Sequence, residues 1–299
     1  METTGKHPLN KYFREDRMPH MWCPGCGIGT AVNAFLNALD KSSMNKDNIA
    51  IVSGIGCTGR VAGYVNLDSF HTTHGRALPF AEGLKAASPE TKVVVFTGDG
   101  DLMSIGGNHF IHAGRKNMDL MIVCVNNLNY AMTGGQVSAT TPKKSITATA
   151  PYGSFCEPFN LPFLAETVGA VYVARWTVYH VRELQKAMSE ALNKKGFSFI
   201  EVISPCPTLY ERRNKMGTAL TRMKFYKENT KVEPGADTRK TTISLSDPFT
   251  VGKFVDVEGK KTYLEAMNEY YDEAFHSDDE YMTYRGLRQK HYEEGCLND

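Results

Sequence analysis

The run Lys92-Val-Val-Val-Phe-Thr97, followed at once by Gly98-Asp99-Gly100, decides the fold of this chain. A second apolar run, residues 118–125, ends at Asn126-Asn127. Continuous apolar runs of this length predict buried parallel strands, and residues 105–115 between them predict the crossover helix that such strands require. Because parallel strands bring their carboxyl ends to one edge of a sheet, we expect the Asp99 carboxylate and the Asn127 amide to meet there.

Oxygen ligands at such an edge suit Mg²⁺, which prefers near-octahedral oxygen coordination and often shares it with phosphate groups. Gly98 and Gly100 would let the backbone approach a diphosphate closely, since neither carries a Cβ atom. The alternative is a pair of turns that only close two strands. The matched pair of motifs in its strand context favours the metal and diphosphate site.

The composition bounds the possible functions. The chain has 299 residues, with 34 basic and 33 acidic side chains and a formal net charge of +1. This balance predicts neither a nucleic-acid partner nor a membrane partner. The polar residues 1–17 lack the apolar core of a secretory signal, which favours a cytoplasmic location. A basic cluster at Arg212, Arg213 and Lys215 predicts either a solvated face or a protein-contact patch.

The pattern of elements predicts an α/β fold with a doubly wound, mostly parallel sheet over residues 1–216. A strand-helix-strand pattern within residues 171–203 completes it. The loop of residues 130–162 is expected to be functional, as long unstructured loops in compact domains usually are. Residues 217–299 have few aliphatic side chains, and their acidic, tyrosine-rich part, residues 263–284, predicts amphipathic helices. We expect a C-terminal arm that packs on its own domain or on a partner subunit.

Seven cysteines, an odd number in a cytoplasmic chain, argue against a disulfide framework. Cys124 lies inside an apolar run and predicts a buried strand residue. Cys23-Pro-Gly-Cys26, Cys57 and Cys206 lie in three loops that the sheet can bring together. Four thiolates suit a [4Fe-4S] cluster or a structural Zn²⁺, whereas a redox dithiol would leave Cys57 and Cys206 unexplained. Cys26 precedes a predicted helix, whose dipole is expected to lower its pKa.

Five segments together closely resemble the β subunit of the 2-oxoacid:ferredoxin oxidoreductases, over residues 20–210. They are Trp22-Cys-Pro-Gly-Cys-Gly27, Gly54-Ile-Gly-Cys-Thr-Gly-Arg60, His74-Gly-Arg-Ala77, Gly98-Asp-Gly100 and Tyr130-Ala-Met-Thr-Gly-Gly-Gln136. The members most similar to this chain act on 2-oxoglutarate (2-oxoglutarate synthase). One departure is Thr58, where other members often have serine. The resemblance implies the diphosphate-binding domain of the thiamine diphosphate fold. It also implies reversible, coenzyme A-dependent decarboxylation of 2-oxoglutarate to succinyl-CoA and CO2, with electrons passing through one [4Fe-4S] cluster to ferredoxin.

The resemblance also implies roles for individual residues. Mg²⁺ would be held by the side chains of Asp99 and Asn127 and by the Asn129 carbonyl, and the cluster by the four cysteines above. The catalytic candidates are His74 and Arg60, whose guanidinium would pair with the distal carboxylate of 2-oxoglutarate. The implied thiamine diphosphate contacts are Ile55, Gly56, Cys57, Thr58, His74, Gly98, Asp99, Gly100, Asn127, Asn129, Ala131, Met132 and Thr133.

The chain lacks a second α/β unit to bind the aminopyrimidine ring. An α subunit is therefore expected to supply the pyrimidine-binding domain and its activating Glu, in an αβ or (αβ)2 assembly. Three alternatives stay open. The same complex could act on pyruvate or another 2-oxoacid, or the chain could be a non-redox thiamine decarboxylase subunit with structural zinc. It could also be a zinc-stabilised assembly subunit without catalytic activity.

Overall fold

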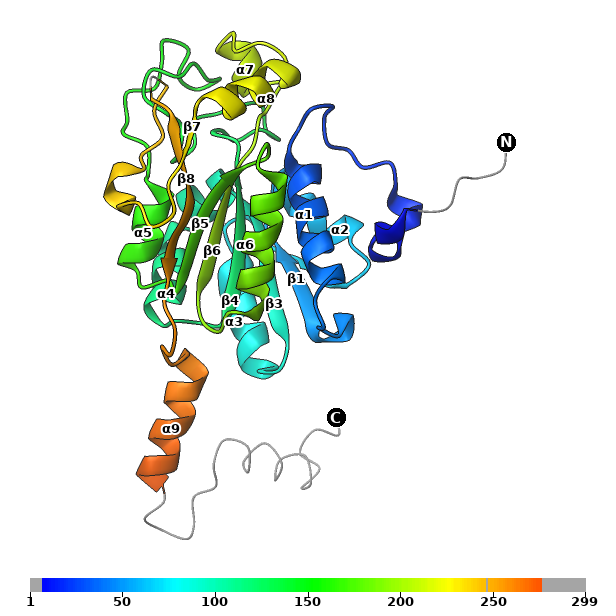
Figure 1. Cartoon of the computed structure of the whole chain (residues 1–299), viewed down its shortest axis with the longest axis vertical. Helices are drawn as coiled ribbons and strands as arrows, with labels where there is room; N and C mark the ends of the chain where they lie inside the picture. Colours follow the sequence, from blue (N-terminus) through cyan, green and yellow to red (C-terminus); the bar gives the residue numbers. More distant parts are fainter. Residues whose placement is uncertain (1–6, 246, 276–299) are drawn as a thin grey trace.

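The computed structural model of the chain describes residues 7–245 and 247–275. One eight-stranded sheet runs through it in the order β2-β1-β3-β4-β6-β5-β8-β7 (Figure 1). Strands β1 to β6 pair in parallel, whereas β8 pairs antiparallel with β5. The prediction of an α/β fold with a mostly parallel sheet is confirmed. The strands are β1 (Ile49–Ser53), β2 (Asp68–His71), β3 (Lys92–Gly98), β4 (Leu120–Asn126), β5 (Tyr172–Thr177), β6 (Ser198–Ile203), β7 (Thr230–Val232) and β8 (Phe249–Asp256).

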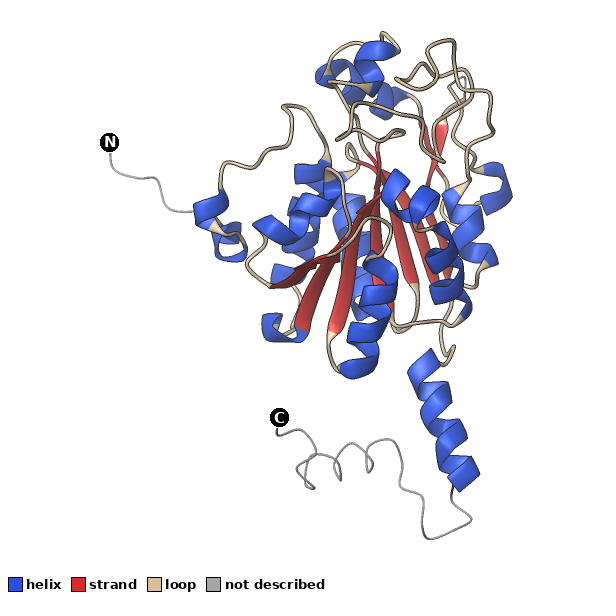
Figure 2. Ribbon diagram, turned by 180° about the vertical axis from the view of Figure 1, so that it is seen from behind, coloured by secondary structure: helices blue, strands red, loops and turns tan. Residues whose placement is uncertain are grey.

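Helices cover both faces of this sheet (Figure 2). One face packs against α1 (Ile28–Asp40) and α6 (Val181–Asn193), and the other against α3 (Ala77–Ala87), α4 (Gly107–Arg115) and α5 (Leu161–Thr167). Along β3, Val94 and Phe96 join the first core and Val93 and Val95 the second. Because successive side chains point to opposite faces, a strand buried on both sides is apolar at every position. This explains the continuous runs in the sequence.

The crossover between β3 and β4 begins differently from the prediction. Residues Gly100–Ile105 form a π-helical turn, and α4 starts only at Gly107. The Gly106 N–H donates to the Asp101 carbonyl at 3.0 Å, which closes this wider turn. Single π-turns often occur at functional sites, and this one directly follows Asp99.

Residues 217–256 extend the same sheet. After α7 (Tyr210–Arg213), they form α8 (Ala219–Glu228), β7 and β8, and Phe249 and Val251 of β8 are buried in the first core. The low aliphatic content of this segment did not indicate these strands. A strand that is added to an existing edge needs few apolar side chains, because the core already exists.

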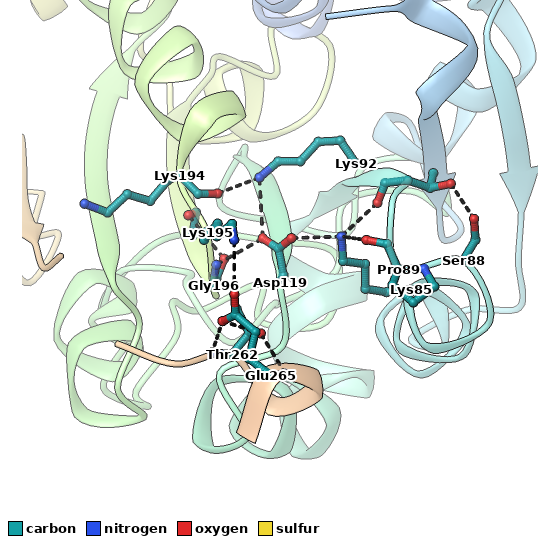
Figure 3. A network of polar contacts seen from close by, with 12 residues as sticks. Lys85, Ser88, Pro89, Lys92, Asp119, Lys194, Lys195, Gly196, Thr262 and Glu265 are labelled. Carbon is teal, nitrogen blue, oxygen red and sulfur yellow. Dashed lines mark hydrogen bonds and ion pairs between the residues drawn. The ribbon is translucent and has the colours of Figure 1, made fainter. Parts of the chain in front are cut away.

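The C-terminal helix α9 (Tyr263–Phe275) starts at a capping box. The Thr262 N–H donates to Glu265 Oε2 at 2.9 Å, and the Glu265 N–H donates to Thr262 Oγ1 at 3.3 Å. Figure 3 shows how this start is tied to the domain: Lys195 pairs with Glu265 at 3.1 Å, beside the buried group of Lys85, Lys92 and Asp119. Beyond this point α9 extends away from the sheet (Figure 1), and none of its described side chains is buried.

The predicted helical segment 263–284 is thus helical to residue 275, and its remainder lies outside the described residues. Among the helices that the structure describes, none has the length and apolar character needed to span a bilayer.

Candidate active site

A pocket opens at the carboxyl ends of β1, β3 and β4. Strands β1 and β3 are neighbours in the sheet, but the chain continues from β1 to β2 on one side and from β3 to β4 on the other. The gap between β1 and β3 is therefore the topological switch point, where doubly wound sheets bind ligands. Its walls come from the loops after β1, β2, β3 and β4. The structure brings every predicted thiamine diphosphate contact to this pocket, together with Asp101 and Tyr130, which the sequence did not indicate.

Three polar groups meet on one side of the pocket. The Asn127 amide nitrogen donates to the Asn129 carbonyl at 2.6 Å and to Asp99 Oδ1 at 3.2 Å. If the amide turns, its oxygen faces the same two oxygens, and a cation between them would then be bound by all three. The nearby Asn129 Oδ1 is also buried without a partner. A carboxylate, an amide and a backbone carbonyl form a donor set that fits Mg²⁺.

Asp99 is held rigidly at the base of this site. Its Oδ2 accepts hydrogen bonds from Ser138 Oγ at 2.5 Å and Thr140 Oγ1 at 2.7 Å. Burial raises the pKa of Asp99 to about 6, although these hydrogen bonds oppose the shift. A bound cation would favour the ionised carboxylate. Ser138 and Thr140 belong to the loop of residues 130–162, so this loop contributes directly to the site.

A buried hydrogen-bonded chain supports Asp99 from within the sheet. Arg175 Nε donates to Glu201 Oε2 at 2.6 Å, and Asn126 Nδ2 donates to Glu201 Oε1 at 2.7 Å. The Thr140 hydroxyl lies between Asn126 Oδ1, at 2.9 Å, and Asp99 Oδ2, at 2.7 Å, and can donate its single proton to either acceptor. Each side chain in this chain is almost completely buried. Apart from Arg175 Nη2, which is buried without a partner among the described residues, these contacts fix the orientation of the Asn126 amide and the Asp99 carboxylate.

Gly100 has a packing role as well as a place in the pocket. A Cβ atom there would lie 2.6 Å from the Tyr130 ring, whose hydroxyl donates to the Gly100 carbonyl at 3.1 Å. At Gly98 a Cβ atom would meet only ordinary contacts. The glycine after Asp99 is therefore required by the loop that packs over it.

Asp101 joins three loops around the pocket, and the sequence-based prediction missed it. Its buried Oδ1 accepts from the Gly75 N–H at 2.7 Å and the Ile55 N–H at 3.2 Å, and it lies 2.5 Å from His74 Nδ1. Its Oδ2 accepts from Thr97 Oγ1 at 2.8 Å. Because an ionised carboxylate can only accept, His74 Nδ1 is the donor in this contact. The sequence signal that could have indicated this role is the second acid of the motif Gly98-Asp-Gly-Asp101.

Replacing Asp101 with alanine is expected to lower the free energy of unfolding by about 2 to 4 kcal/mol, because two backbone N–H groups lose their acceptor. The loops that carry Ile55 and His74 would also loosen, and thiamine diphosphate affinity would fall. Denaturant unfolding and cofactor titration measure the two effects. Asp68→Ala, at an exposed position of β2, is the matched control. Equal behaviour of the two variants would contradict the role of Asp101.

The two catalytic candidates, His74 and Arg60, differ in their position relative to the pocket. His74 lines the pocket, with its ring 6.0 Å from the Tyr130 ring between centroids. Arg60 is not among the residues that line it. It ends the short 3-10 turn Thr58–Arg60 behind Cys57, and its Nε is buried without a hydrogen-bond partner.

The four predicted cluster cysteines come together at the same end of the sheet. The thiols of Cys23, Cys57 and Cys206 each raise the pKa of Cys26, which requires that they lie near it. Trp22 Nε1 donates to the Cys57 carbonyl at 2.8 Å and so joins the Cys-Pro-Gly-Cys loop to the loop after β1. Within residues 7–245 and 247–275, no three His, Cys, Asp or Glu side chains are placed to hold a single metal ion.

The predicted pKa of Cys26 was wrong in direction. Burial raises the pKa of Cys26 to about 12 and outweighs the backbone N–H of Ile28 at the helix start, which lowers it. Burial likewise raises the pKa of Cys57 to about 11. A cationic metal centre would reverse this preference, since coordinated thiols are deprotonated. Cys124 is fully buried in β4, as predicted.

Comparison with known proteins agrees with this geometry. Residues 40–202 match the family of the thiamine pyrophosphate enzyme, C-terminal TPP binding domain. The chain is 52% identical over 251 residues to the 2-oxoglutarate synthase subunit KorB of Methanothermobacter marburgensis, covering 84% of this chain and 88% of that one. It is 47% identical over 262 residues to the KorB of Methanocaldococcus jannaschii, covering 88% and 96%.

A solved structure is similar over the whole chain. It is the 2-oxoglutarate:ferredoxin oxidoreductase from Magnetococcus marinus with 2-oxoglutarate, coenzyme A and succinyl-CoA bound. The TM-score is 0.81 at 27% identity, covering 100% of this chain and 98% of that one.

The fold and the pocket at the switch point define the diphosphate-binding domain of a thiamine pyrophosphate enzyme. Within that class, the chain belongs to the KorB family of 2-oxoglutarate synthase subunits, which are oxidoreductases. The names of these relatives mark them as subunits of a larger enzyme.

Proposed function

We propose that the chain is the β subunit of a cytoplasmic enzyme that converts 2-oxoglutarate and coenzyme A to succinyl-CoA and CO2 and reduces ferredoxin, reversibly. One observation carries the proposal: Cys57 belongs both to the four-cysteine group and to the wall of the cofactor pocket. A one-electron centre on these cysteines would therefore lie beside the thiamine diphosphate site. The names of the relatives and of the similar solved structure support the substrate.

The residues of this chain would divide the work of binding. Asp99, Asn127 and the Asn129 carbonyl would hold Mg²⁺, which in turn binds the diphosphate. His74, positioned by Asp101, would present Nε2 to the pocket. When bound, thiamine diphosphate supplies the carbanion stabilisation that decarboxylation of a 2-oxoacid requires. The α subunit would contribute the pyrimidine-binding domain and its Glu, in an αβ or (αβ)2 assembly.

The cysteines would hold a [4Fe-4S] cluster. Cys23, Cys26, Cys57 and Cys206 come from three separate loops, and their thiols are buried or half-buried. Such a centre supplies one-electron capacity, which ferredoxin as acceptor requires. Metal analysis and the absorption spectrum of anaerobically purified protein distinguish it from zinc.

The test of this function is an anaerobic assay of the chain produced together with its α subunit. We expect methyl viologen reduction that requires both 2-oxoglutarate and coenzyme A. Reduction with pyruvate but not with 2-oxoglutarate would assign a different substrate. Release of CO2 without viologen reduction, in protein that contains zinc, would indicate the non-redox decarboxylase.

Arg60 gives a test of substrate choice. A charge-assisted hydrogen bond lost from a closed site costs about 1.5–3 kcal/mol, or roughly ten- to a hundredfold in kcat/KM. If Arg60 pairs with the distal carboxylate, Arg60→Ala lowers kcat/KM for 2-oxoglutarate by that factor and leaves pyruvate activity nearly unchanged. Parallel steady-state assays with viologen measure both. An equal fall for the two substrates would instead make Arg60 a support of the Cys57 loop.

A further inference from the structure

The basic cluster noted in the sequence becomes a defined surface in the structure. The exposed cations Arg212, Arg213, Lys215, Lys224 and Lys227 lie on and around α7 and α8, and we call this surface the basic corner. Of the two acids among residues 208–228, Glu211 is buried and lies 3.7 Å from the buried Arg222, whereas Glu228 is exposed at the end of α8. Within the described parts of the chain, none of the five cations of the basic corner is in an ion pair.

The cysteine group lies directly beneath this corner. The Cys23 thiol is 3.7 Å from Thr208 Oγ1, just before α7. The Cys-Pro-Gly-Cys loop touches the start of α8, since a Cβ atom on Gly25 would lie only 2.2 Å from the Ala219 Cβ. Cys206 immediately precedes this segment, and its N–H donates to Glu211 at 2.6 Å. The helices α7 and α8 therefore cover the cysteines, at the end of the sheet opposite α9 (Figure 1).

An exposed apolar side chain lies on α8 among these cations. Leu220 is 67% exposed and directly follows Ala219, which faces Gly25. Leu220, Lys224 and Lys227 are spaced at i, i+4 and i+7, so they share the outer face of α8. An apolar centre with a charged rim is the usual composition of a transient protein interface.

We propose that the basic corner is the docking surface for an acidic one-electron carrier protein. The inference rests on the proposed function, because it requires a redox centre at the cysteines. Five unpaired cations on a chain with a net charge of only +1 make a local positive field that attracts an acidic partner and orients it over the cysteines. The carrier would then bind over Leu220, with its redox centre facing the Cys23–Thr208 contact.

The test compares two electron acceptors in the complete complex with its α subunit. The variant carries Arg212→Glu, Lys215→Glu and Lys224→Glu. The matched control carries Lys41→Glu and Lys46→Glu, two exposed positions after α1, before β1. Arg213 is left unchanged because its Nη2 donates to the Gly134 carbonyl at 3.3 Å, beside the cofactor loop. The probes are an acidic ferredoxin and methyl viologen, and ferredoxin binding is also measured directly by surface plasmon resonance.

In the variant, we expect both the KM and the Kd for ferredoxin to rise at least about tenfold at low ionic strength. Both constants should also depend much less on salt concentration than in the unmodified complex. Iron content and viologen reduction would stay at the level of the unmodified complex, and the control would match it in every measurement. Unchanged ferredoxin binding in the variant would overturn the proposal. So would loss of assembly with the α subunit, which would assign this face to that subunit. If the unmodified complex fails to reduce viologen with 2-oxoglutarate, the proposed function itself fails.

Discussion

Replacing Asp99 with alanine or asparagine is expected to weaken Mg²⁺ and thiamine diphosphate retention by at least about a hundredfold. Its carboxylate is the one charged group among the three proposed Mg²⁺ ligands, and a contact with a charged group contributes about 1.5–3 kcal/mol. Loss of the metal would also remove its contact with the diphosphate. The asparagine variant keeps the shape and an acceptor for Ser138 and Thr140, so it separates the loss of charge from a packing effect. Cofactor content after gel filtration measures the change.

The cysteines provide the internal control for this experiment. Both Asp99 variants are expected to keep normal iron and sulfide, because Asp99 belongs to the oxygen site and not to the proposed cluster ligands. Full retention of thiamine diphosphate in Asp99→Ala would remove Asp99 as a metal ligand. Simultaneous loss of iron would show that the domain had not folded, and the asparagine variant would then decide.

The second large effect is expected at the cysteines. Cys206→Ala and Cys57→Ala should each lose iron and 2-oxoglutarate-dependent viologen reduction. Cys206 gives the cleaner result, because Cys57 also lines the cofactor pocket. Cys124→Ala is the control: it removes a fully buried thiol from β4 and is expected to cost only about 1 kcal/mol of stability.

Iron and sulfide analysis of anaerobic protein, together with thermal unfolding, distinguishes these outcomes. Normal iron in Cys206→Ala would exclude it as a ligand. Stoichiometric zinc in the unmodified protein, lost in the same variant, would indicate a structural metal site in place of a redox centre.

The sequence was most informative where chemistry follows strand order. Asp99 and Asn127 each lie directly after an apolar run, and parallel pairing of β3 with β4 brings them to one edge. The predicted pocket residues meet for the same reason, because the loops after β1, β3 and β4 all leave from that edge. Residues that are distant along the chain could be grouped because the sheet imposes the geometry.

Contacts between loops were harder to predict from the sequence. Ser138 and Thr140 reach Asp99 from a loop with no periodic pattern, so nothing local distinguished them from the other hydroxyl residues around them. The pKa of Cys26 was predicted from its helix start alone, whereas burial by distant segments decides its direction. Strand β8 was missed because its pairing with β5 depends on a free sheet edge and not on its own composition.

The sequence by itself therefore determined the class of fold, the end of the sheet that carries the site, and the oxygen and sulfur groups gathered there. Hydrophobic runs identify the strands from local sequence alone. Parallel pairing then places the residues that follow each strand at the same edge of the sheet. Only the tertiary structure showed that Asp101 joins the loops of Ile55 and His74, and that α7 and α8 place exposed cations above the cysteines. Burial and charge proximity arise from segments that meet only after folding, and no spacing along the chain encodes them.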